Sequence, residues 1–289
     1  MGYIILAYFL WGSLAIYWKQ LKSVPSLEIL AHRIIWSFVF LALLILVSRN
    51  RRFFLDDFKK FRKNPKMIMG IVAATIFLNI NWLTYIWAIN HGYIIQTSLG
   101  YYINPVLTVL MGVFVLQEKL TKWQWLSFFI VMMGVLFLTV TSGSFPLLSF
   151  ILAISFCLYS LIKKRIELLS LSALTIETFL SAIPAAIYLI WLSATAKSSF
   201  HFSLSRIPLL LIGAGVVTAI PLLFFNLGTK LLPLNRVGIF QYISPSMTLL
   251  IGIFIYHETF TLFYLAAFLI IWLGLSLFVS QTYGKRMKA

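Results

Sequence analysis

The feature that most constrains this chain is a succession of apolar runs along its whole length. A helix needs about 20 mostly apolar residues to cross the hydrocarbon core of a bilayer. Ten runs of this kind can be placed, at residues 2–18, 29–48, 67–88, 94–116, 123–141, 145–162, 170–194, 208–228, 237–256 and 261–281. They predict an all-α integral membrane protein with ten transmembrane helices, because a helix satisfies its own backbone groups in lipid.

The composition excludes a soluble domain. The chain is 61% hydrophobic and 10% charged, whereas soluble proteins average about 45–50% apolar and about 25% charged residues. A soluble fold built from it would expose large apolar patches. The first run, 2–18, lacks a basic leader and a small-residue cleavage site, so we expect it to be retained as a helix. Cys157 is the single cysteine, which excludes an internal disulfide.

The placement of the basic residues predicts an orientation. With the N-terminus inside, eighteen of the 23 Lys and Arg residues fall in inner segments and four in outer loops. This asymmetry is the positive-inside pattern, so we expect both termini to be cytoplasmic. The densest basic run, 49–66, is expected to face anionic lipid head groups. It predicts no nucleic-acid binding, because no stacking platform or folded reader accompanies the charge.

Two stretches of the sequence repeat each other. "YYINPVLTVLMGVFVLQEKLT" at 101–121 matches "QYISPSMTLLIGIFIYHETFT" at 241–261 with an offset of 140 and no gap. Over 99–139 and 239–279 there are 12 identities in 41 positions, among them Pro105/Pro245, Gly112/Gly252, Glu118/Glu258 and Gly134/Gly274. We therefore predict a first five-helix repeat over 1–141, a second over 145–281, and a basic cytoplasmic tail over 282–289.

The number of helices in the repeat has a functional consequence. Five is odd, so the second copy must cross the membrane in the opposite direction to the first. Inverted repeats are a hallmark of secondary transporters, whose solute site lies where the repeats meet. The sequence thus predicts alternating-access transport of a small organic solute, with protons as a candidate coupling ion. A facilitative channel and a non-transporting membrane protein, such as a lipid-modifying enzyme, are the alternatives.

Motifs for other chemistry are absent from the sequence. It contains no P-loop Gly-Lys-Ser/Thr run, no H-E-x-x-H and no G-x-S-x-G, which are the patterns of nucleotide hydrolysis, zinc proteolysis and serine hydrolysis. We therefore expect no enzyme activity, no catalytic residue, no metal and no cofactor.

Ionisable residues interrupt two of the apolar runs. His32 and Arg33 lie near the start of one, and an offset of about 145 places them opposite Glu177 and Thr178 in the second half. Arg33 is either an interfacial anchor that snorkels or a cation that faces the cavity and binds an anionic group or a carboxylate. Glu177 either exchanges a proton or contacts solute, or makes a structural hydrogen bond. An Arg33–Glu177 pair is an open alternative.

Further candidates combine aromatic rings with amides. Asn79, Asn81, Trp82 and Tyr85 lie at helical spacing in one run, where they would form either a solute-facing wall or interhelical bonds of about 0.6 kcal/mol each. Candidates of the same type elsewhere in the chain are Trp11, Tyr102, Asn104, Tyr159, Asn226, Gln241 and Tyr242. The matched prolines, Pro105 and Pro245, are candidate hinges that we expect to bend their helices alike.

These residues resemble a known family. Two five-helix repeats with a proline-containing fourth helix, a turn glutamate and a glycine-containing last helix are similar to the EamA group of the drug/metabolite transporter superfamily. The similarity is carried by "YFLWGSLAIYWKQLKSVPSLEILAHRIIWSFVF", "TIETF" and "FQYISPSMTLLIGIFIYHE". The resemblance implies a ten-helix bacterial inner-membrane protein that exports or exchanges small organic solutes. It also implies that Trp11, His32 and Arg33 belong to the signature region, and Glu177 to the motif of the seventh helix.

Overall fold

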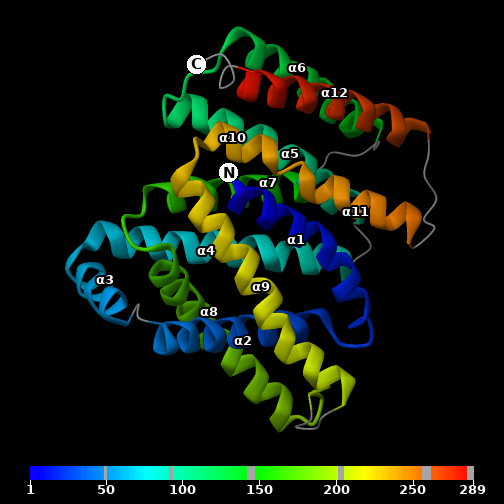
Figure 1. The fold of residues 1–289 in the computed structure, drawn as a ribbon. Coiled ribbons are helices and arrows are strands. Elements are labelled where there is room, and N and C mark those ends of the chain that lie inside the picture. The colour runs from blue at the N-terminus through cyan, green and yellow to red at the C-terminus, as the bar shows by residue number, and fades with distance from the viewer. Residues whose placement is uncertain (49–50, 91–93, 142–146, 201–204, 256–261, 285–289) are drawn as a thin grey trace.

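The structure is a computed structural model. It describes residues 1–48, 51–90, 94–141, 147–200, 205–255 and 262–284. The described chain is helical, and Figure 1 shows its twelve helices. They are α1 (Gly2–Lys19), α2 (Ser26–Val47), α3 (Arg51–Lys63), α4 (Pro65–Asn90), α5 (Ile94–Val115), α6 (Lys122–Thr141), α7 (Leu147–Arg165), α8 (Ser170–Ala194), α9 (Arg206–Leu231), α10 (Leu234–Phe240), α11 (Ile243–Phe254) and α12 (Leu262–Gly284).

Many of these helices have the length and composition of membrane spans. Among the described residues, six stretches are long and apolar enough to cross a bilayer, and they lie in α2, α4, α6, α7, α8 and α9. Two shorter apolar helical stretches, Leu99–Val115 and Leu265–Gln281, lie in α5 and α12. Exposed leucine, isoleucine and phenylalanine side chains cover the outside of these helices. The chain is a multi-pass, all-α membrane protein.

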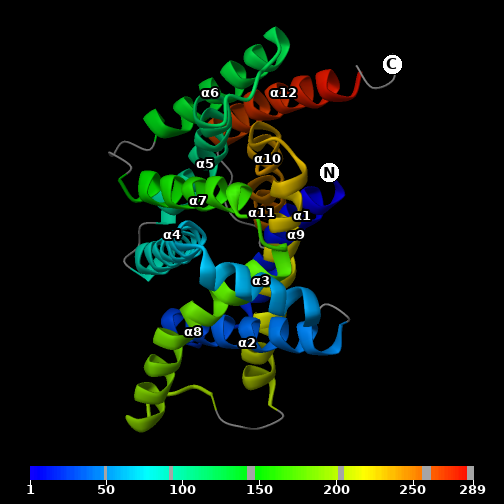
Figure 2. The same cartoon turned by 90° about the vertical axis from the view of Figure 1, so that its left-hand side faces the viewer.

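The helices of the first half pack mainly against those of the second half. At one extremity α6 lies against α12, and at the other α2 packs on α8, as Figures 1 and 2 both show. Between these pairs, α1 packs on α9 and α11, while α4 and α5 pack on α7. The fourth predicted span of the first half also meets its counterpart in the second half, because α5 packs on α10. The core is therefore shared between the halves.

The ninth predicted span differs from the expectation. The sequence predicts one helix over 237–256, but the chain ends α10 at Phe240, turns at Gln241 and Tyr242, and begins α11 at Ile243. Pro245 has no N–H to donate to the carbonyl four residues earlier, and its ring would clash with it. The Gln241 carbonyl instead accepts the N–H of Ser244 at 3.2 Å.

The two candidate hinge prolines therefore do not act alike. α5 continues through Pro105 without interruption, whereas its counterpart is divided into α10 and α11 next to Pro245. At the crossing of α5 with α10, a Cβ at Gly238 would lie 2.9 Å from the carbonyl oxygen of Pro105. Only glycine allows this close approach of the two helices.

The basic connections meet at one end of the molecule, which we call the basic end. Glu118, in the α5–α6 connection, accepts hydrogen bonds from the backbone N–H groups of Leu234 and Asn235 at 2.6 and 2.8 Å. The Lys164 ammonium donates to the Leu232 carbonyl at 2.5 Å. The connections α5–α6, α7–α8 and α9–α10 thus share one end, as the orientation predicted from the basic residues requires.

The connections α1–α2 and α8–α9 meet at the opposite end, which we call the far end. The Glu28 carboxylate, completely buried, accepts from the Ser198 hydroxyl at 2.9 Å and from the Ser199 N–H at 2.7 Å. Arg206 donates to the Gln20 side chain at 2.9 Å. These bonds hold the start of α2 against the segment that precedes α9.

α3 is a helix that the sequence analysis treated only as a basic segment. It is amphipathic, with Phe54 and Phe61 packed against the buried cluster formed by Ile71, Ile166, Leu168, Ala173 and Ile176. The buried Asp57 accepts a hydrogen bond from the Leu169 N–H at 3.0 Å, and this bond ties α3 to the start of α8. The predicted tail, 282–289, lies outside the described residues from 285 onward, and α12 extends to Gly284.

Candidate functional site

An aromatic cluster occupies the middle of the molecule, between α1, α7 and α9. Phe225 of α9 lies at its centre, with ring centroids 6.0 Å from Tyr8, 5.5 Å from Trp11, 5.4 Å from Phe156 and 6.1 Å from Tyr159. We call these five residues the central aromatic cluster. It brings together Trp11 and Tyr159, two of the candidates from the sequence, from opposite halves of the chain.

Buried polar atoms without hydrogen-bond partners lie beside this cluster. Among the described residues they include the Tyr8 hydroxyl, the Asn226 side-chain nitrogen and both polar atoms of the Gln241 amide. Their side chains are at most 4% exposed. The Tyr8 hydroxyl lies near the Gln241 amide without a hydrogen bond of normal geometry between them. Buried polar groups are nearly always satisfied in proteins, so this arrangement is typical of a site that receives a polar ligand.

Glu177 forms an ion pair inside the helix bundle. Its Oε1 atom lies 2.5 Å from Nζ of Lys163, and both side chains are at most 1% exposed. The Tyr159 hydroxyl donates to Oε2 of Glu177 at 3.5 Å, and it also lies 3.3 Å from Oδ1 of Asn226. Because desolvating two ions costs several kcal/mol each, such a pair persists only with good geometry and additional hydrogen bonds.

This ion pair is close to the basic end. Lys163 belongs to the last turn of α7, and the next residue, Lys164, donates to the carbonyls of Thr229 and Leu232. Lys230 of α9 donates to the Leu168 carbonyl. Charged side chains from α7, α8 and α9 therefore lie between the central aromatic cluster and the basic end.

Arg33 contacts two tryptophan rings, toward the far end. Its guanidinium carbon is 4.2 Å from the ring centroid of Trp82 in α4 and 5.4 Å from that of Trp18 in α1. Each such cation–π contact contributes about 0.5–2 kcal/mol, more when it is desolvated. The described residues form two ion pairs, Lys59–Asp56 and Lys163–Glu177, and Arg33 takes part in neither. An Arg33–Glu177 pair is therefore wrong for this structure.

His32 faces a different neighbour from Arg33. Its ring lies 4.6 Å from the ring of Phe200, in the segment between α8 and α9, and the side chain is 5% exposed. Neither ring nitrogen has a hydrogen-bond partner within the described structure. The two adjacent residues thus point to different sides of α2, as the turn of about 100° per residue in a helix requires.

The expected solute-facing wall on α4 is divided in the structure. The Asn79 side chain donates to Ser181 of α8 at 2.8 Å, and the Asn81 side chain donates to the Leu152 carbonyl of α7 at 2.8 Å. The two amides therefore form interhelical hydrogen bonds, the second of the two alternatives that the sequence leaves open for this segment. Trp82 instead contacts Arg33, and Tyr85 packs edge-on against Tyr101 of α5 at 5.8 Å.

The remaining candidates make structural contacts. The Tyr242 hydroxyl donates to the Tyr102 carbonyl at 3.0 Å, and the Tyr102 ring packs edge-on against Phe268 of α12 at 5.3 Å. Asn104 accepts hydrogen bonds from Thr108 within its own helix. The contacts of Tyr102 connect α5 with the α10–α11 turn and with α12, outside the central aromatic cluster.

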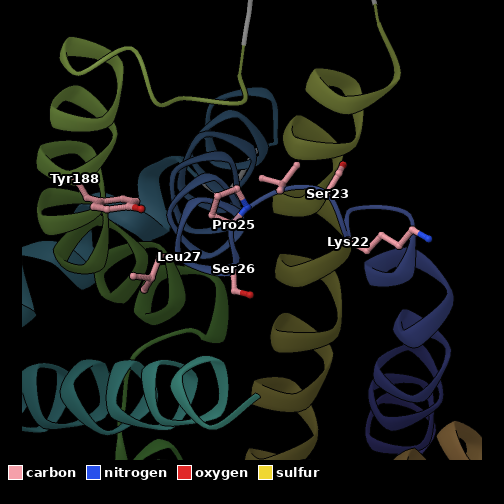
Figure 3. A pocket seen from close by; sticks show the side chains of 7 residues that line it. Lys22, Ser23, Pro25, Ser26, Leu27 and Tyr188 are labelled. Atoms are coloured by element: carbon pink, nitrogen blue, oxygen red, sulfur yellow. The ribbon is translucent and has the colours of Figure 1, made fainter. Parts of the chain in front are cut away.

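Two hollows in the surface lie away from the central aromatic cluster. One, of about 430 Å³, lies at the far end, and Figure 3 shows Tyr188 of α8 and Lys22 of the α1–α2 connection on opposite sides of it. The other, of about 310 Å³, lies between α2, α3, α8 and α9 near the basic end and is mostly apolar. The five aromatic residues line neither of them.

Sequence reasoning missed several residues of this site. Lys163 precedes Lys164 and Arg165, so it was counted with the basic residues of a loop although it is completely buried. Tyr8, Trp18 and Phe225 are aromatic residues in runs rich in aromatics, with no feature that separates them from interfacial residues.

Comparisons with known proteins agree with this architecture. The EamA-like transporter family model matches residues 1–140. An uncharacterized transporter of Bacillus subtilis, YojE, is 44% identical over 98% of this chain and 95% of its own length. Protein RarD of Salmonella typhi is 38% identical over 98% and 95%, and Protein RarD of Escherichia coli is 36% identical over 94% and 91%.

The fold also matches a solved crystal structure. The TM-score is 0.73 at 16% sequence identity, and the match covers 99% of this chain and 98% of the other. At this identity the likeness extends to the fold alone. The full-length relatives decide the family: the chain belongs to the EamA-like transporter family and is a homologue of the RarD proteins.

Proposed function

We propose that this protein is a secondary transporter that moves small organic solutes across the bacterial inner membrane by alternating access. Its relatives in Bacillus subtilis, Vibrio cholerae and Pseudomonas aeruginosa are named as transporters. In this proposal the solute binds at the central aromatic cluster, and the two ends of the bundle open in turn. The basic end faces the cytoplasm, as the positive-inside rule favours.

The observation that carries the proposal is the set of unpartnered polar atoms of Tyr8, Asn226 and Gln241. They lie beside five aromatic rings at the junction of the two halves. An unsatisfied buried polar group costs about 1–3 kcal/mol, so a protein with only a structural role gains nothing by keeping four such atoms together. A solute with an apolar body and a few polar groups would satisfy them while its body contacts the rings.

The helix contacts support an inverted relation between residues 1–141 and 145–281. The contact of α1 with α9 corresponds to the contact of α7 with α4 in the other half. In the same way, the contact of α1 with α11 corresponds to the contact of α7 with α5. α2 packs on α8, α5 on α10, and α6 on α12, which are each a helix with its own counterpart. This is the contact pattern of two units related by a two-fold axis. An axis in the membrane plane gives inverted repeats.

Contacts between the first two spans of each half would serve as the two gates. Trp18 contacts Arg33 between α1 and α2, toward the far end, and Lys163 contacts Glu177 between α7 and α8, near the basic end. An offset of 145 relates Trp18 to Lys163, and the same offset relates His32 to Glu177. In this proposal one contact breaks while the other holds, so that a path to the central aromatic cluster opens at one end at a time.

Glu177 also provides a means of coupling transport to protons. Protonation of its carboxylate would abolish the ion pair with Lys163 and weaken the closure of the basic end. The Tyr159 hydroxyl, which contacts both Glu177 and Asn226, joins this gate to the solute site. Proton release and solute movement can therefore affect each other through two hydrogen bonds.

The proposal is tested in proteoliposomes loaded with a soluble metabolite extract. Mass spectrometry identifies solutes that leave the vesicles only when the protein is present, and exchange is then measured with the labelled solute. We expect external unlabelled solute to accelerate the efflux of labelled solute, and Glu177→Gln to change the pH dependence. Efflux without this acceleration indicates a channel, and chemical conversion of the solute indicates an enzyme. Either result, or no efflux at all, contradicts the proposal.

A further inference from the structure

The environment of Arg33 specifies a class of solute. The residue lies seven positions after the start of α2, about 10 Å along the helix. The rings of Trp18 and Trp82 contact the guanidinium, and the side chains of Tyr85 and Tyr101 lie near it. Four helices of the first half, α1, α2, α4 and α5, contribute to this arrangement.

The described carboxylates are engaged elsewhere or lie outside this environment. Glu28 binds the segment before α9, Asp57 binds the start of α8, and Glu118 binds the start of α10. Glu177 pairs with Lys163, Asp56 lies on the exposed side of α3 near Lys59, and Glu167 is exposed in the α7–α8 connection at the basic end. None of the described acidic residues therefore neutralises Arg33, although the cation lies within a membrane-spanning helix.

The unused hydrogen-bonding capacity of Arg33 lies at the edge of its planar head group. The tryptophan rings contact the cation as cation–π partners, an interaction that uses no N–H donor. The buried Nε atom has no hydrogen-bond partner in the described structure. Guanidinium N–H groups lie in one plane and match the two oxygens of a carboxylate or phosphate group. The missing partner has the chemistry of an anion.

We propose that Arg33 is the anchor for an anionic group of the transported solute, so that the solute is an organic anion with an apolar, aromatic-compatible body. This inference rests on the proposed function and deepens it. Trp82 connects the two sites, because it contacts Arg33 and packs against the same buried leucines and alanine as Trp11. A solute anchored at Arg33 would place its body along Trp82, toward the central aromatic cluster.

The test is a binding measurement that does not depend on transport. The purified full-length protein in phosphatidylcholine nanodiscs is titrated by calorimetry with 3-phenylpropionate, its neutral amide and 3-phenylpropylamine. We expect the carboxylate to bind at least tenfold more tightly than the amide, and the amine to bind most weakly. Arg33→Gln should abolish the preference for the carboxylate, and Arg33→Lys should retain part of it, because it keeps the charge and loses the planar fork.

A matched control separates this site from general surface charge. Arg206 is an exposed arginine at the same end, bonded to Gln20, and Arg206→Gln should leave the preference unchanged. Circular dichroism and size-exclusion chromatography confirm that the variants are folded. A wild type that does not prefer the carboxylate, or that binds none of the probes, contradicts the proposal. So does a preference that survives Arg33→Gln.

Two further outcomes are informative. One distinguishes a lipid phosphate from a free solute as the source of the anion, and the other distinguishes failure of the anion site from failure of the transport function. If the preference is present in phosphatidylcholine nanodiscs but abolished by adding phosphatidylglycerol, Arg33 holds a lipid phosphate, and the assignment to a free solute is overturned. If binding behaves as expected but reconstituted vesicles show no exchange of any solute, the anion site stands while the transport function fails.

Discussion

Gly134 of α6 and Gly274 of α12 contact each other's helices at equivalent positions. A Cβ at Gly134 would lie 2.7 Å from the Ile271 side chain and 3.1 Å from the Ala267 carbonyl, and a Cβ at Gly274 would lie 2.7 Å from the Val131 side chain and 2.9 Å from the Ser127 carbonyl. Shifting either set of contacts by 140 residues gives the other. The α6–α12 contact is therefore reciprocal, which is the local signature expected of two repeats around a two-fold axis.

Because the two contacts are equivalent, we expect substitutions there to have equal effects. Gly134→Val and Gly274→Val should each lower the free energy of unfolding by about 1–3 kcal/mol, since each inserts atoms into a packed contact. Gly70→Val is the control, because its Cβ would lie 3.8 Å from the nearest side chain. Denaturant unfolding of the purified protein in detergent measures the three. A large effect at one glycine and none at the other would contradict the reciprocal contact.

The Lys163–Glu177 pair predicts a non-additive pattern of stability. Lys163→Met or Glu177→Gln alone leaves one buried charge without its partner and should destabilise the protein by roughly 3–5 kcal/mol. The double replacement Lys163→Met with Glu177→Gln removes both charges and should be more stable than either single variant. Thermal unfolding in detergent measures the series. Additive losses in the double variant would indicate that the two side chains do not act as a pair.

Tyr8 should be required for transport but not for stability. Its hydroxyl is buried without a partner, so Tyr8→Phe removes an unsatisfied group and should leave the melting temperature unchanged or higher. We expect the rate of solute exchange to fall about tenfold, equivalent to about 1.4 kcal/mol.

Tyr242→Phe is the matched control for this prediction. It removes a hydroxyl that donates to the Tyr102 carbonyl and should cost about 1 kcal/mol of stability while exchange continues. The reverse pattern, with Tyr8→Phe unstable and fully active, would remove Tyr8 from the solute site.

Asp57 should hold α3 against the bundle. Asp57→Ala removes the acceptor for the Leu169 N–H, so we expect faster trypsin cleavage within Arg51–Lys63, which is rich in lysine and arginine. Asp56→Ala is the control, because Asp56 is exposed and its carboxylate lies 4.0 Å from Lys59. Mass spectrometry of the fragments over time measures cleavage. Equal rates in the two variants would show that the Asp57 bond does not restrain the helix.

The sequence predicts the helices of this fold well because each apolar run must satisfy its own backbone in lipid. Nine of the ten predicted runs coincide with single helices of the described chain to within a few residues. The ninth run is not a single helix, because the chain turns near Gln241, whose carbonyl Pro245 cannot hydrogen-bond. The effect of a proline at this position of the repeat depends on the surrounding structure. Pro105 is the equivalent of Pro245 in the first repeat, yet α5 continues through it. The spacing of Phe54, Phe58 and Phe61 was a readable signal for α3.

The candidate site is predicted less well, because residue type alone does not reveal partners. Asn79 and Asn81 are the polar residues expected in a solute path, but neighbouring helices supply acceptors for both side chains. Lys163 is hidden in a basic run that the positive-inside rule fully explains. The sequence draws attention to Glu177 but does not identify its partner, since Lys163 and Arg33 are equally plausible cations until the helices are packed.

The central claim is that the two halves cross the membrane in opposite directions. Positions 119 and 259 are equivalent under the 140-residue offset. They are changed one at a time to cysteine in a Cys157→Ser background and labelled with a membrane-impermeant maleimide. In intact cells we predict labelling at 259 and protection at 119, and in inside-out vesicles the reverse. Labelling of both positions from the same side of the membrane would contradict the account.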